Sequence, residues 1–187
     1  MRVLKQIPSL EILQSSIFVY PTETCYGLGC DALQSDLVKR IYQIKGRDFK
    51  KPMSWIVADI KMAKRYVRFS AKALKLAQKY WPGPLTLVLP PKKSSHLIAL
   101  RVSSHPIAKK IAEELNKPII STSANLSGSS NCYSIKEVIS QFKNQKFQPD
   151  FIIDGGDLSL VQPTTIILAI RDQIKVLRQG GLFLESK

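Results

Sequence analysis

The sequence has 187 residues, 44% of them hydrophobic, and this length and composition predict a single globular domain over residues 1–187. Its 28 lysines and arginines against 14 acidic residues give a formal charge of +14, which predicts a polyanionic partner such as nucleic acid or nucleotide phosphates. Three cysteines without C-x-x-C spacing argue against a disulfide framework or a zinc site, and short apolar runs argue against a membrane span, so we expect a cytoplasmic protein.

The first predicted elements are a short helix over residues 8–15 and an apolar strand that ends at Tyr20. Pro21 has no N–H to donate to a strand ladder, so we expect residues 22–29 to form a loop. This loop contains three hydroxyls, one carboxylate and two glycines, and α/β proteins often bind ligands in such loops at strand ends. The same pattern is equally compatible with a turn whose polar side chains face water.

The middle of the chain alternates between helical and extended patterns. A helix is expected between an N-cap at Ser35 and a terminating glycine at Gly46. The following elements are, in order, a strand at residues 53–58, a helix capped by Asp59, a helix capped by Ser70, a rigid turn at Trp81-Pro-Gly-Pro84, and strands at residues 85–89 and 97–102.

The last part of the chain continues the alternation. It contains, in order, a helix at residues 107–115 begun by Pro106, a strand at 118–120, a polar loop at 121–131, a helix opened by a Ser134–Glu137 capping box, and strands at 151–153, 165–170 and 174–177, the last two joined by a tight turn at 171–173. Interleaved strands and helices predict an α/β fold with a mixed parallel and antiparallel sheet flanked by helices.

Several polar segments are not needed for folding and are candidates for chemistry. Lys45-Gly46-Arg47, with Lys51 close behind, suits adjacent phosphates, although the cations could simply stabilise a helix C-terminus. Residues 121–128 contain four hydroxyls and an amide and could hold an anion, or form an ordinary surface turn. Arg101 lies within an apolar strand and needs an anionic partner, either a ligand or an internal carboxylate.

The sequence lacks the glycine-rich motifs of P-loop and dinucleotide-binding proteins. Its two histidines, His96 and His105, have neither metal-ligand nor catalytic-triad spacing, and we expect His105 to adjoin a helix N-terminus. No residue is predicted as a metal ligand. The cations and hydroxyls that remain suit phosphoryl or nucleotidyl transfer, in which positioning and charge stabilisation provide most of the catalysis.

Taken together, these segments resemble the YrdC/TsaC family of threonylcarbamoyl-AMP synthases. The matching segments occur in family order along nearly the whole chain, and they are Pro21-Thr-Glu-Thr-Cys-Tyr-Gly-Leu-Gly-Cys-Asp-Ala32, Lys45-Gly-Arg47, Lys51-Pro52, Trp81-Pro-Gly-Pro-Leu-Thr86, Leu100-Arg-Val102 with His105-Pro106, Ser121-Thr-Ser-Ala-Asn-Leu-Ser-Gly128 and Leu177-Arg-Gln-Gly180. The chain resembles the short single-domain form of the family. The resemblance implies a twisted sheet with a basic concave cleft.

The resemblance also implies an activity: L-threonine, bicarbonate or CO₂, and ATP give L-threonylcarbamoyladenylate and pyrophosphate, which serves threonylcarbamoyladenosine formation in tRNA. By motif position it places Thr24, Arg101, Ser121 and Thr164 around threonine. It places Lys45, Arg47, Lys51, Ser123, Asn125, Asn131 and Arg178 around ATP, with Lys45 and Arg47 as the catalytic residues and Tyr26 lining the same cleft. Mg²⁺ is expected with ATP, and a downstream threonylcarbamoyl transferase complex is the expected protein partner.

Four positions depart from the family pattern. Asp48 and Ser103 stand where prolines are usual, Ile56 occupies the place of a family histidine near threonine, and the Gln162-Pro-Thr-Thr165 variant leaves Thr164 and Thr165 as alternatives at the threonine site. Glu23 has no role that the sequence assigns. Besides the small substrates, tRNA or double-stranded RNA is an expected partner of the basic face. The alternative function is a non-catalytic protein that binds double-stranded RNA or a ribosomal precursor through its basic concavity.

Overall fold

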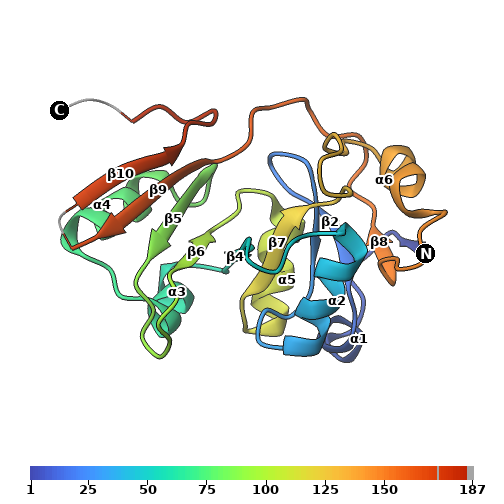
Figure 1. Cartoon of the computed structure of the whole chain (residues 1–187), viewed down its shortest axis with the longest axis horizontal. Coiled ribbons are helices and arrows are strands. Elements are labelled where there is room, and N and C mark those ends of the chain that lie inside the picture. The colour runs from blue at the N-terminus through green and yellow to red at the C-terminus, as the bar shows by residue number, and fades with distance from the viewer. Residues whose placement is uncertain (172, 185–187) are drawn as a thin grey trace.

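A computed structural model describes residues 1–171 and 173–184, which form one long twisted sheet with helices on both faces (Figure 1). The strands are β1 (Arg2–Leu4), β2 (Phe18–Pro21), β3 (Tyr26–Gly29), β4 (Ser54–Ile56), β5 (Leu85–Leu89), β6 (Ile98–Arg101), β7 (Ile119–Ser123), β8 (Phe151–Ile153), β9 (Thr165–Ile170) and β10 (Gln173–Arg178). The helices are α1 (Leu10–Ser15), α2 (Ser35–Lys45), α3 (Ile60–Tyr66), α4 (Ala71–Tyr80), α5 (Pro106–Leu115) and α6 (Ile135–Phe142).

The strand order in the sheet is β1-β8-β2-β3-β7-β4-β6-β5-β9-β10. Strand pairs β1–β8, β2–β8, β4–β6 and β5–β9 are parallel, and the remaining neighbours are antiparallel. The predicted α/β fold with a mixed sheet is therefore confirmed. Strands β7 and β4 join the two halves of the sheet, which lie side by side in Figure 1.

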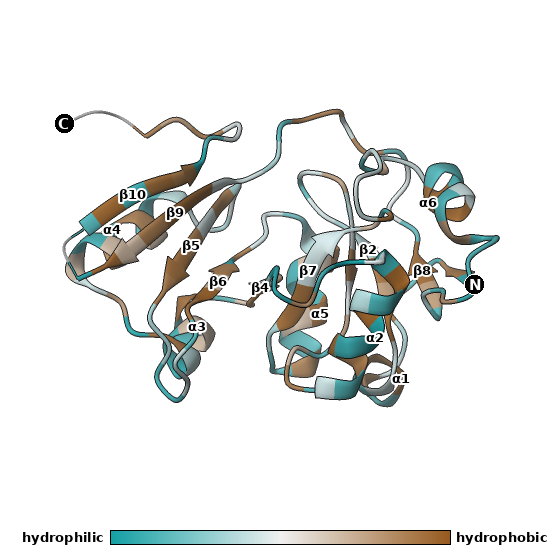
Figure 2. Ribbon diagram, viewed as in Figure 1, coloured by the Kyte–Doolittle hydropathy of each residue, from teal (hydrophilic) through white to brown (hydrophobic). Residues whose placement is uncertain are grey.

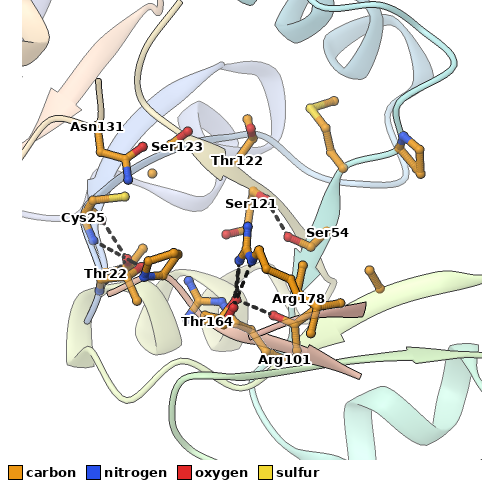
Figure 3. Close-up of a pocket in the computed structure, with 18 of the residues that line it drawn as sticks. Thr22, Cys25, Ser54, Arg101, Ser121, Thr122, Ser123, Asn131, Thr164 and Arg178 are labelled. Carbon is orange, nitrogen blue, oxygen red and sulfur yellow. Dashed lines mark hydrogen bonds between the residues drawn. The ribbon is translucent and has the colours of Figure 1, made fainter. Parts of the chain in front are cut away.

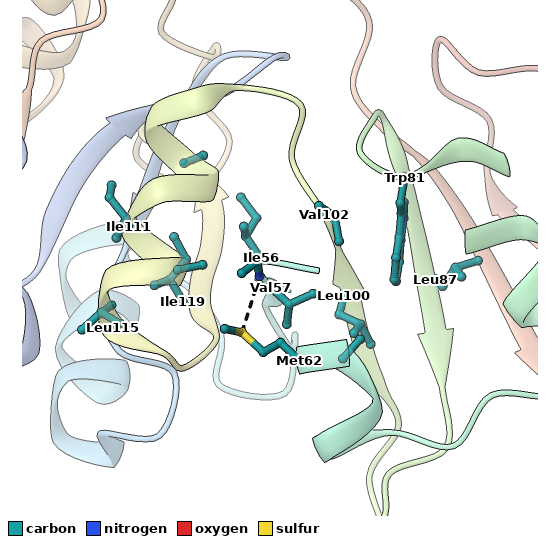
Figure 4. Packing of buried hydrophobic residues seen from close by; sticks show 14 of the residues in the cluster. Ile56, Val57, Met62, Trp81, Leu87, Leu100, Val102, Ile111, Leu115 and Ile119 are labelled. Atoms are coloured by element: carbon teal, nitrogen blue, oxygen red, sulfur yellow. Dashed lines mark hydrogen bonds between the residues drawn. The ribbon is translucent and has the colours of Figure 1, made fainter. Parts of the chain in front are cut away.

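Two hydrophobic cores cover opposite faces of the sheet, because alternate residues of a strand point to opposite sides. Helices α1, α3, α4 and α5 pack with residues such as Phe18, Leu85 and Leu87 in the larger core. Figure 4 shows part of this core, with Met62 of α3, Ile111 of α5 and the strand residue Leu87. Helices α2 and α6 pack with Ile17 and Val19 in the other core. Figure 2 shows the strands as mainly hydrophobic and the helices as mixed, as expected for helices that bury one face.

Short-range signals placed most helix ends correctly. The Asp59 side chain accepts a hydrogen bond from the Met62 N–H, and Ser70 accepts one from Ala73. Ser134 and Glu137 form the predicted capping box, and Gly46 ends α2 with a φ of 57°. His105 is the N-cap of α5, as predicted, with its Nδ1 accepting from the Ile107 N–H.

The predicted loop over residues 22–29 is wrong in its second half, which is strand β3. Pro21 does not stop the ladder but is the last residue of β2 and pairs with Tyr26, so the loop is limited to residues 22–25. The glycines belong to the strand: a Cβ on Gly29 would lie 2.2 Å from the Ile120 carbonyl oxygen, so glycine allows this close strand packing.

Two further expectations need correction. Residues 121–123 belong to β7 rather than to a loop, and Ser35 is the first residue of α2, whose N-cap Gln34 makes no side-chain capping bond. Strand β1 was not predicted. The predicted turn at residues 171–173 includes Asp172, which lies outside the described residues. No described helix is long and apolar enough to cross a membrane.

Candidate ligand-binding cleft

A cavity of about 290 Å³ opens where the two halves of the sheet meet (Figure 3). Segments from six parts of the chain line it: the 22–25 loop with β3, the α2–β4 connection, β5 and β6, the end of β7 with Asn131, the start of β9, and β10. Three of the described lining residues are arginines, eight carry hydroxyls and none is acidic. Thr86 lines this cavity, whereas its neighbours Leu85 and Leu87 pack in the core of α3 and α4, so the cavity lies on the opposite face of the sheet from these helices.

The 22–25 loop is held by its own hydrogen bonds. The Thr22 hydroxyl donates to the Cys25 carbonyl oxygen at 2.7 Å and accepts from the backbone N–H groups of Thr24 and Cys25 at 3.2 and 3.3 Å. The hydroxyl oxygens of Thr22 and Thr24 lie 3.1 Å apart, and both residues are buried. Thr24 is thereby fixed on the cavity wall, where the sequence placed a threonine ligand.

Arg101 is buried at the end of β6 and lines the cavity. Its Nη1 donates to Oε1 of Glu23, while the Ser103 hydroxyl donates to Oε2 of the same carboxylate. The internal-carboxylate alternative is therefore realised, and Arg101 still lines the cavity. Glu23, which the sequence left without a role, orients Arg101, and Ser103, at a position where the resemblance implies proline, supplies a hydroxyl that also bonds this carboxylate.

Arg178 is tied to the opposite wall of the cavity. Its Nε and Nη2 donate to the Thr164 carbonyl oxygen at 3.1 and 2.8 Å, and Nη2 lies 3.1 Å from the Thr164 hydroxyl (Figure 3). The Thr164 hydroxyl also lies 3.0 Å from that of Thr86, a lining residue that was not among the predicted ligands. Thr165 points away: it is fully buried and its hydroxyl donates to the Leu182 carbonyl oxygen. Of the two alternatives, Thr164 therefore lines the cavity and Thr165 does not.

Gly180 allows the chain after β10 to pack closely against Pro163 and Thr164. A Cβ at this position would lie 2.0 Å from the Pro163 carbonyl oxygen, so only glycine fits against the strand start that carries Thr164.

The electrostatics of the cavity favour an anion. Burial and the nearby Arg101 guanidinium lower the pKa of Arg178 below its ordinary value. The described lining residues of this cavity include no acidic side chain, so the positive charges of Arg101 and Arg178 repel each other there. A negatively charged ligand between the two guanidiniums relieves this repulsion.

A second cavity of about 340 Å³ adjoins the first and shares Arg47 and Ser123 with it. Arg47 donates to the carbonyl oxygens of Lys51 and Pro52 at 3.1 and 3.2 Å, and Lys51 also lines this second cavity. Of the predicted cations in the α2–β4 connection, Arg47 therefore lines both cavities and Lys51 lines the second.

Lys45 has a different setting from the one that its motif suggested. It is 3% exposed, and its Nζ donates to the carbonyl oxygens of Ser123 and Asn125, at 2.5 and 2.7 Å, and to the Asn125 side-chain oxygen at 3.0 Å. All three ammonium protons thus have protein acceptors. Burial and the neighbouring Arg47 charge lower the pKa of Lys45 to about 8.

The polar segment after β7 is a connected network. The Ser123 hydroxyl donates to the Asn125 side-chain oxygen at 2.6 Å, and the Asn125 amide donates to the Ser129 carbonyl oxygen. Ser121 and Asn131 line the first cavity and Asn125 lines the second, while Ser54, whose hydroxyl donates to the Ser121 carbonyl oxygen at 2.7 Å, joins the first.

One residue lies differently from expectation, and two others have no assigned part in ligand binding. Tyr26 does not line either cavity: it packs in the core of α2 and α6, and its hydroxyl donates to the Gly156 carbonyl oxygen at 2.7 Å. Ile56 is fully buried in the larger core. Cys25 lines the cavity as a free thiol, and burial raises its pKa. No cluster of three or more histidine, cysteine or acidic side chains among the described residues could hold a metal ion.

The fold and cavity define an α/β protein with a cleft lined by arginines and hydroxyls. The Sua5/YciO/YrdC family model, described as Telomere recombination, matches residues 11–180, and the chain belongs to this family.

Individual relatives agree with this assignment. The chain is 35% identical over 184 residues to a protein of Pyrococcus abyssi named threonylcarbamoyl-AMP synthase, with 94% of this chain and 53% of the relative covered. It is 38% identical over 173 residues to a protein of the same name from Psychromonas ingrahamii, with 86% and 90% covered. The crystal structure of P. abyssi Sua5 complexed with L-threonine matches with a TM-score of 0.86 and 31% identity over 97% of this chain and 57% of that chain. The chain thus spans about half the length of the Pyrococcus relative.

Proposed function

We propose that this chain is a threonylcarbamoyl-AMP synthase, a nucleotidyltransferase that makes L-threonylcarbamoyladenylate and pyrophosphate from L-threonine, bicarbonate or CO₂, and ATP. The observation that carries the proposal is the convergence of Arg47, Arg101 and Arg178 with a set of hydroxyls on one cavity. Two relatives with the corresponding name and a related structure that holds L-threonine support it.

In this proposal threonine occupies the cavity between Arg101 and Arg178. The N–H groups of Arg101 that Glu23 does not use hold the carboxylate, and the hydroxyls of Thr24, Ser121 and Thr164 orient the amine and side chain. Because Glu23 and Thr164 hold the two arginines in advance, little reorganisation is needed when the substrate binds.

ATP extends from this cavity into the second one. Arg47 and Ser123 line both cavities and therefore lie where the α-phosphate meets the threonine derivative, with Lys51, Asn125, Asn131 and Arg178 as further contacts. Lys45 acts as a positioning residue, since its ammonium holds the backbone of Ser123 and Asn125 in place.

The reaction needs no protein nucleophile. The threonine amine combines with bicarbonate to form a carbamate and water, and a carbamate oxygen attacks the α-phosphorus while the bond to pyrophosphate breaks. The charge on the departing pyrophosphate is stabilised by the arginines of the cleft, consistent with phosphoryl chemistry in which positioning and electrostatics dominate.

The described lining of the first cavity contains hydroxyls and an amide but no carboxylate, and the described lining of the second contains a single carboxylate, that of Asp48, so neither cavity suits a resident Mg²⁺ held by protein ligands alone. We propose that Mg²⁺ enters as the complex with ATP, bound by the triphosphate. The product would pass in the cytoplasm to a threonylcarbamoyl transferase complex that modifies tRNA.

The test is to incubate the purified chain with ATP, L-threonine and bicarbonate and to detect threonylcarbamoyl-AMP by mass spectrometry. Reactions that lack one substrate, and the Arg178→Ala variant, are the controls, and product should appear only in the complete reaction with the unmodified chain. No product, with salt-sensitive binding to double-stranded RNA retained, would contradict the proposal and favour a non-catalytic RNA-binding protein.

A further inference from the structure

The positive charge of the molecule is concentrated in one segment of the chain. Residues 60–112 contain 12 of the 28 lysines and arginines and none of the 14 acidic residues, so this segment carries nearly all of the net charge of +14. It forms α3, α4, β5, β6 and most of α5; the first four make up much of one half of the molecule in Figure 1, and α5 lies in the other half beside β7.

Nine of these twelve cations lie on the outer surface of α3 and α4, just after α3, or on the turn between β5 and β6, whereas Arg101 is buried in the cleft and Lys109 and Lys110 are on α5. Lys61, Lys64 and Arg65 in α3, with Arg68 just after it, follow a spacing of three and four residues and therefore share one helix face. Lys72, Lys75 and Lys79 do the same on α4. All of these side chains are exposed, as are Lys92 and Lys93 in the β5–β6 turn.

Backbone contacts hold the turn against the end of α3. The Lys92 N–H donates to the Tyr66 carbonyl oxygen at 2.8 Å, and the Arg68 N–H donates to the Pro90 carbonyl oxygen at 2.8 Å. The cations of α3 and of the β5–β6 turn are thus parts of one rigid surface, which with α4 we name the α3–α4 surface.

This surface differs from other basic helix faces of the same chain. On α5, Lys109 and Lys110 each pair with a glutamate four residues later. Within the described residues, Lys61, Lys64, Lys75 and Lys93 have no such carboxylate partner. Their charges are left available for an external polyanion.

The chemistry of the surface favours nucleic acid over a membrane. No large hydrophobic residue in α3, α4 or the β5–β6 turn up to Lys93 is among the exposed ones, whereas helices that lie on membranes insert such residues. Tyr66 and Tyr80 lie partly exposed among the cations, with Arg65 5.7 Å and Lys79 5.3 Å from the respective ring centroids. Interleaved cations and aromatic rings suit a phosphate backbone with neighbouring bases or sugars.

We propose that the α3–α4 surface is a docking site for the phosphate backbone of structured RNA, on the opposite face of the sheet from the cleft. The choice of RNA rests on the proposed function, whose product is destined for tRNA. RNA bound at this surface leaves the cleft open, so that RNA and the small substrates bind simultaneously.

The experiment measures binding of fluorescently labelled unmodified tRNA to the full chain by anisotropy at 50–200 mM salt. The test variant replaces Lys61, Lys64, Lys75 and Lys93 by Gln. We expect a loss of affinity of tenfold or more and a flatter salt dependence, with the slope of log K against log salt reduced by about 1 for each phosphate that the variant no longer neutralises. The matched control replaces four exposed lysines of α2, α6 and the chain after α6, Lys39, Lys136, Lys143 and Lys146, and should bind nearly as the unmodified chain does.

Equal losses in the two variants would show that only net charge matters and would overturn the proposal, as would unchanged binding in the test variant. A stronger loss of binding to phosphatidylserine vesicles than to tRNA would assign the surface to membranes instead. Formation of threonylcarbamoyl-AMP is measured on the same proteins, and it should be unaffected by the test substitutions. If the unmodified chain forms no product but the test variant still loses tRNA, the proposed function fails and the docking surface stands.

Discussion

The cleft and the α3–α4 surface are both rich in cations, but their cations differ in burial and in how many hydrogen bonds hold them. In the cleft, Arg101 and Lys45 are buried. The side chains of Arg101, Lys45 and Arg178 are each held in one position by hydrogen bonds to oxygen atoms of the protein. On the α3–α4 surface the cations are exposed on long flexible side chains. Ordered cations can position one small substrate to within a fraction of an ångström, whereas mobile ones adapt to a polymer with repeating charge.

This contrast predicts its largest effect at Arg101. Arg101→Met leaves Glu23 partly buried without its counter-ion, which should cost about 3–5 kcal/mol of unfolding free energy. Product formation should fall on the order of 100-fold or more. Denaturant titration and product assays measure the two effects.

The double variant Glu23→Gln/Arg101→Met separates structure from substrate binding. Removal of both charges should restore much of the stability, but not the activity, because the substrate carboxylate still lacks its partner. Recovery of product formation in the double variant would mean that Arg101 serves only to satisfy Glu23.

The motif cations Lys45 and Arg47 should behave differently. Lys45→Ala removes three hydrogen bonds inside the protein and should lower both product formation and stability, the latter by roughly 2–4 kcal/mol. Arg47→Ala should lower product formation about as much and stability by less than about 1 kcal/mol, since its side chain bonds only to exposed backbone oxygens. Thermal unfolding of both variants tests this distinction, and equal losses of stability would show that Arg47 also has a structural role.

The lowered pKa of Lys45 predicts a pH effect. Its folded-state pKa of about 8 lies below the ordinary value of 10.5, so between these pH values the unfolded chain binds more protons and the contribution of Lys45 to stability rises with pH. Product formation should instead decline above pH 8, because the neutral amine loses one of its three donors to the segment after β7. Comparison of the unmodified chain with Lys45→Met between pH 7 and 10 isolates this contribution; parallel stability profiles would contradict the assignment.

The smallest effect is expected on the α3–α4 surface. Replacing Lys61, Lys64, Lys75 or Lys93 singly by Gln should change unfolding free energy by no more than about 0.5 kcal/mol, since these exposed side chains make no described ion pair. Chemical denaturation measures this. A decrease above about 1 kcal/mol for any of them would show that the surface is built for stability, and would remove the contrast with the cleft.

Prediction from sequence succeeded where the deciding interaction is local. The caps at Asp59, Ser70 and Ser134 join residues three apart, and they place helix starts whatever the rest of the chain does. Strand β3 was missed because its glycines and polar neighbours resemble a turn, and it becomes a strand only because β2 and β7 lie on either side of it.

The sequence by itself determined the alternating α/β order, most helix boundaries, the family resemblance and the residue types of the cleft, since these depend on short-range patterns and on motif order. Only the tertiary structure decided that Thr164 rather than Thr165 faces the cavity, that Lys45 turns inward, and that Glu23 pairs with Arg101 across 78 residues of chain. Strand register sets which side chains point into the cavity, and long-range packing sets which charges meet. Neither is encoded by neighbours in the sequence.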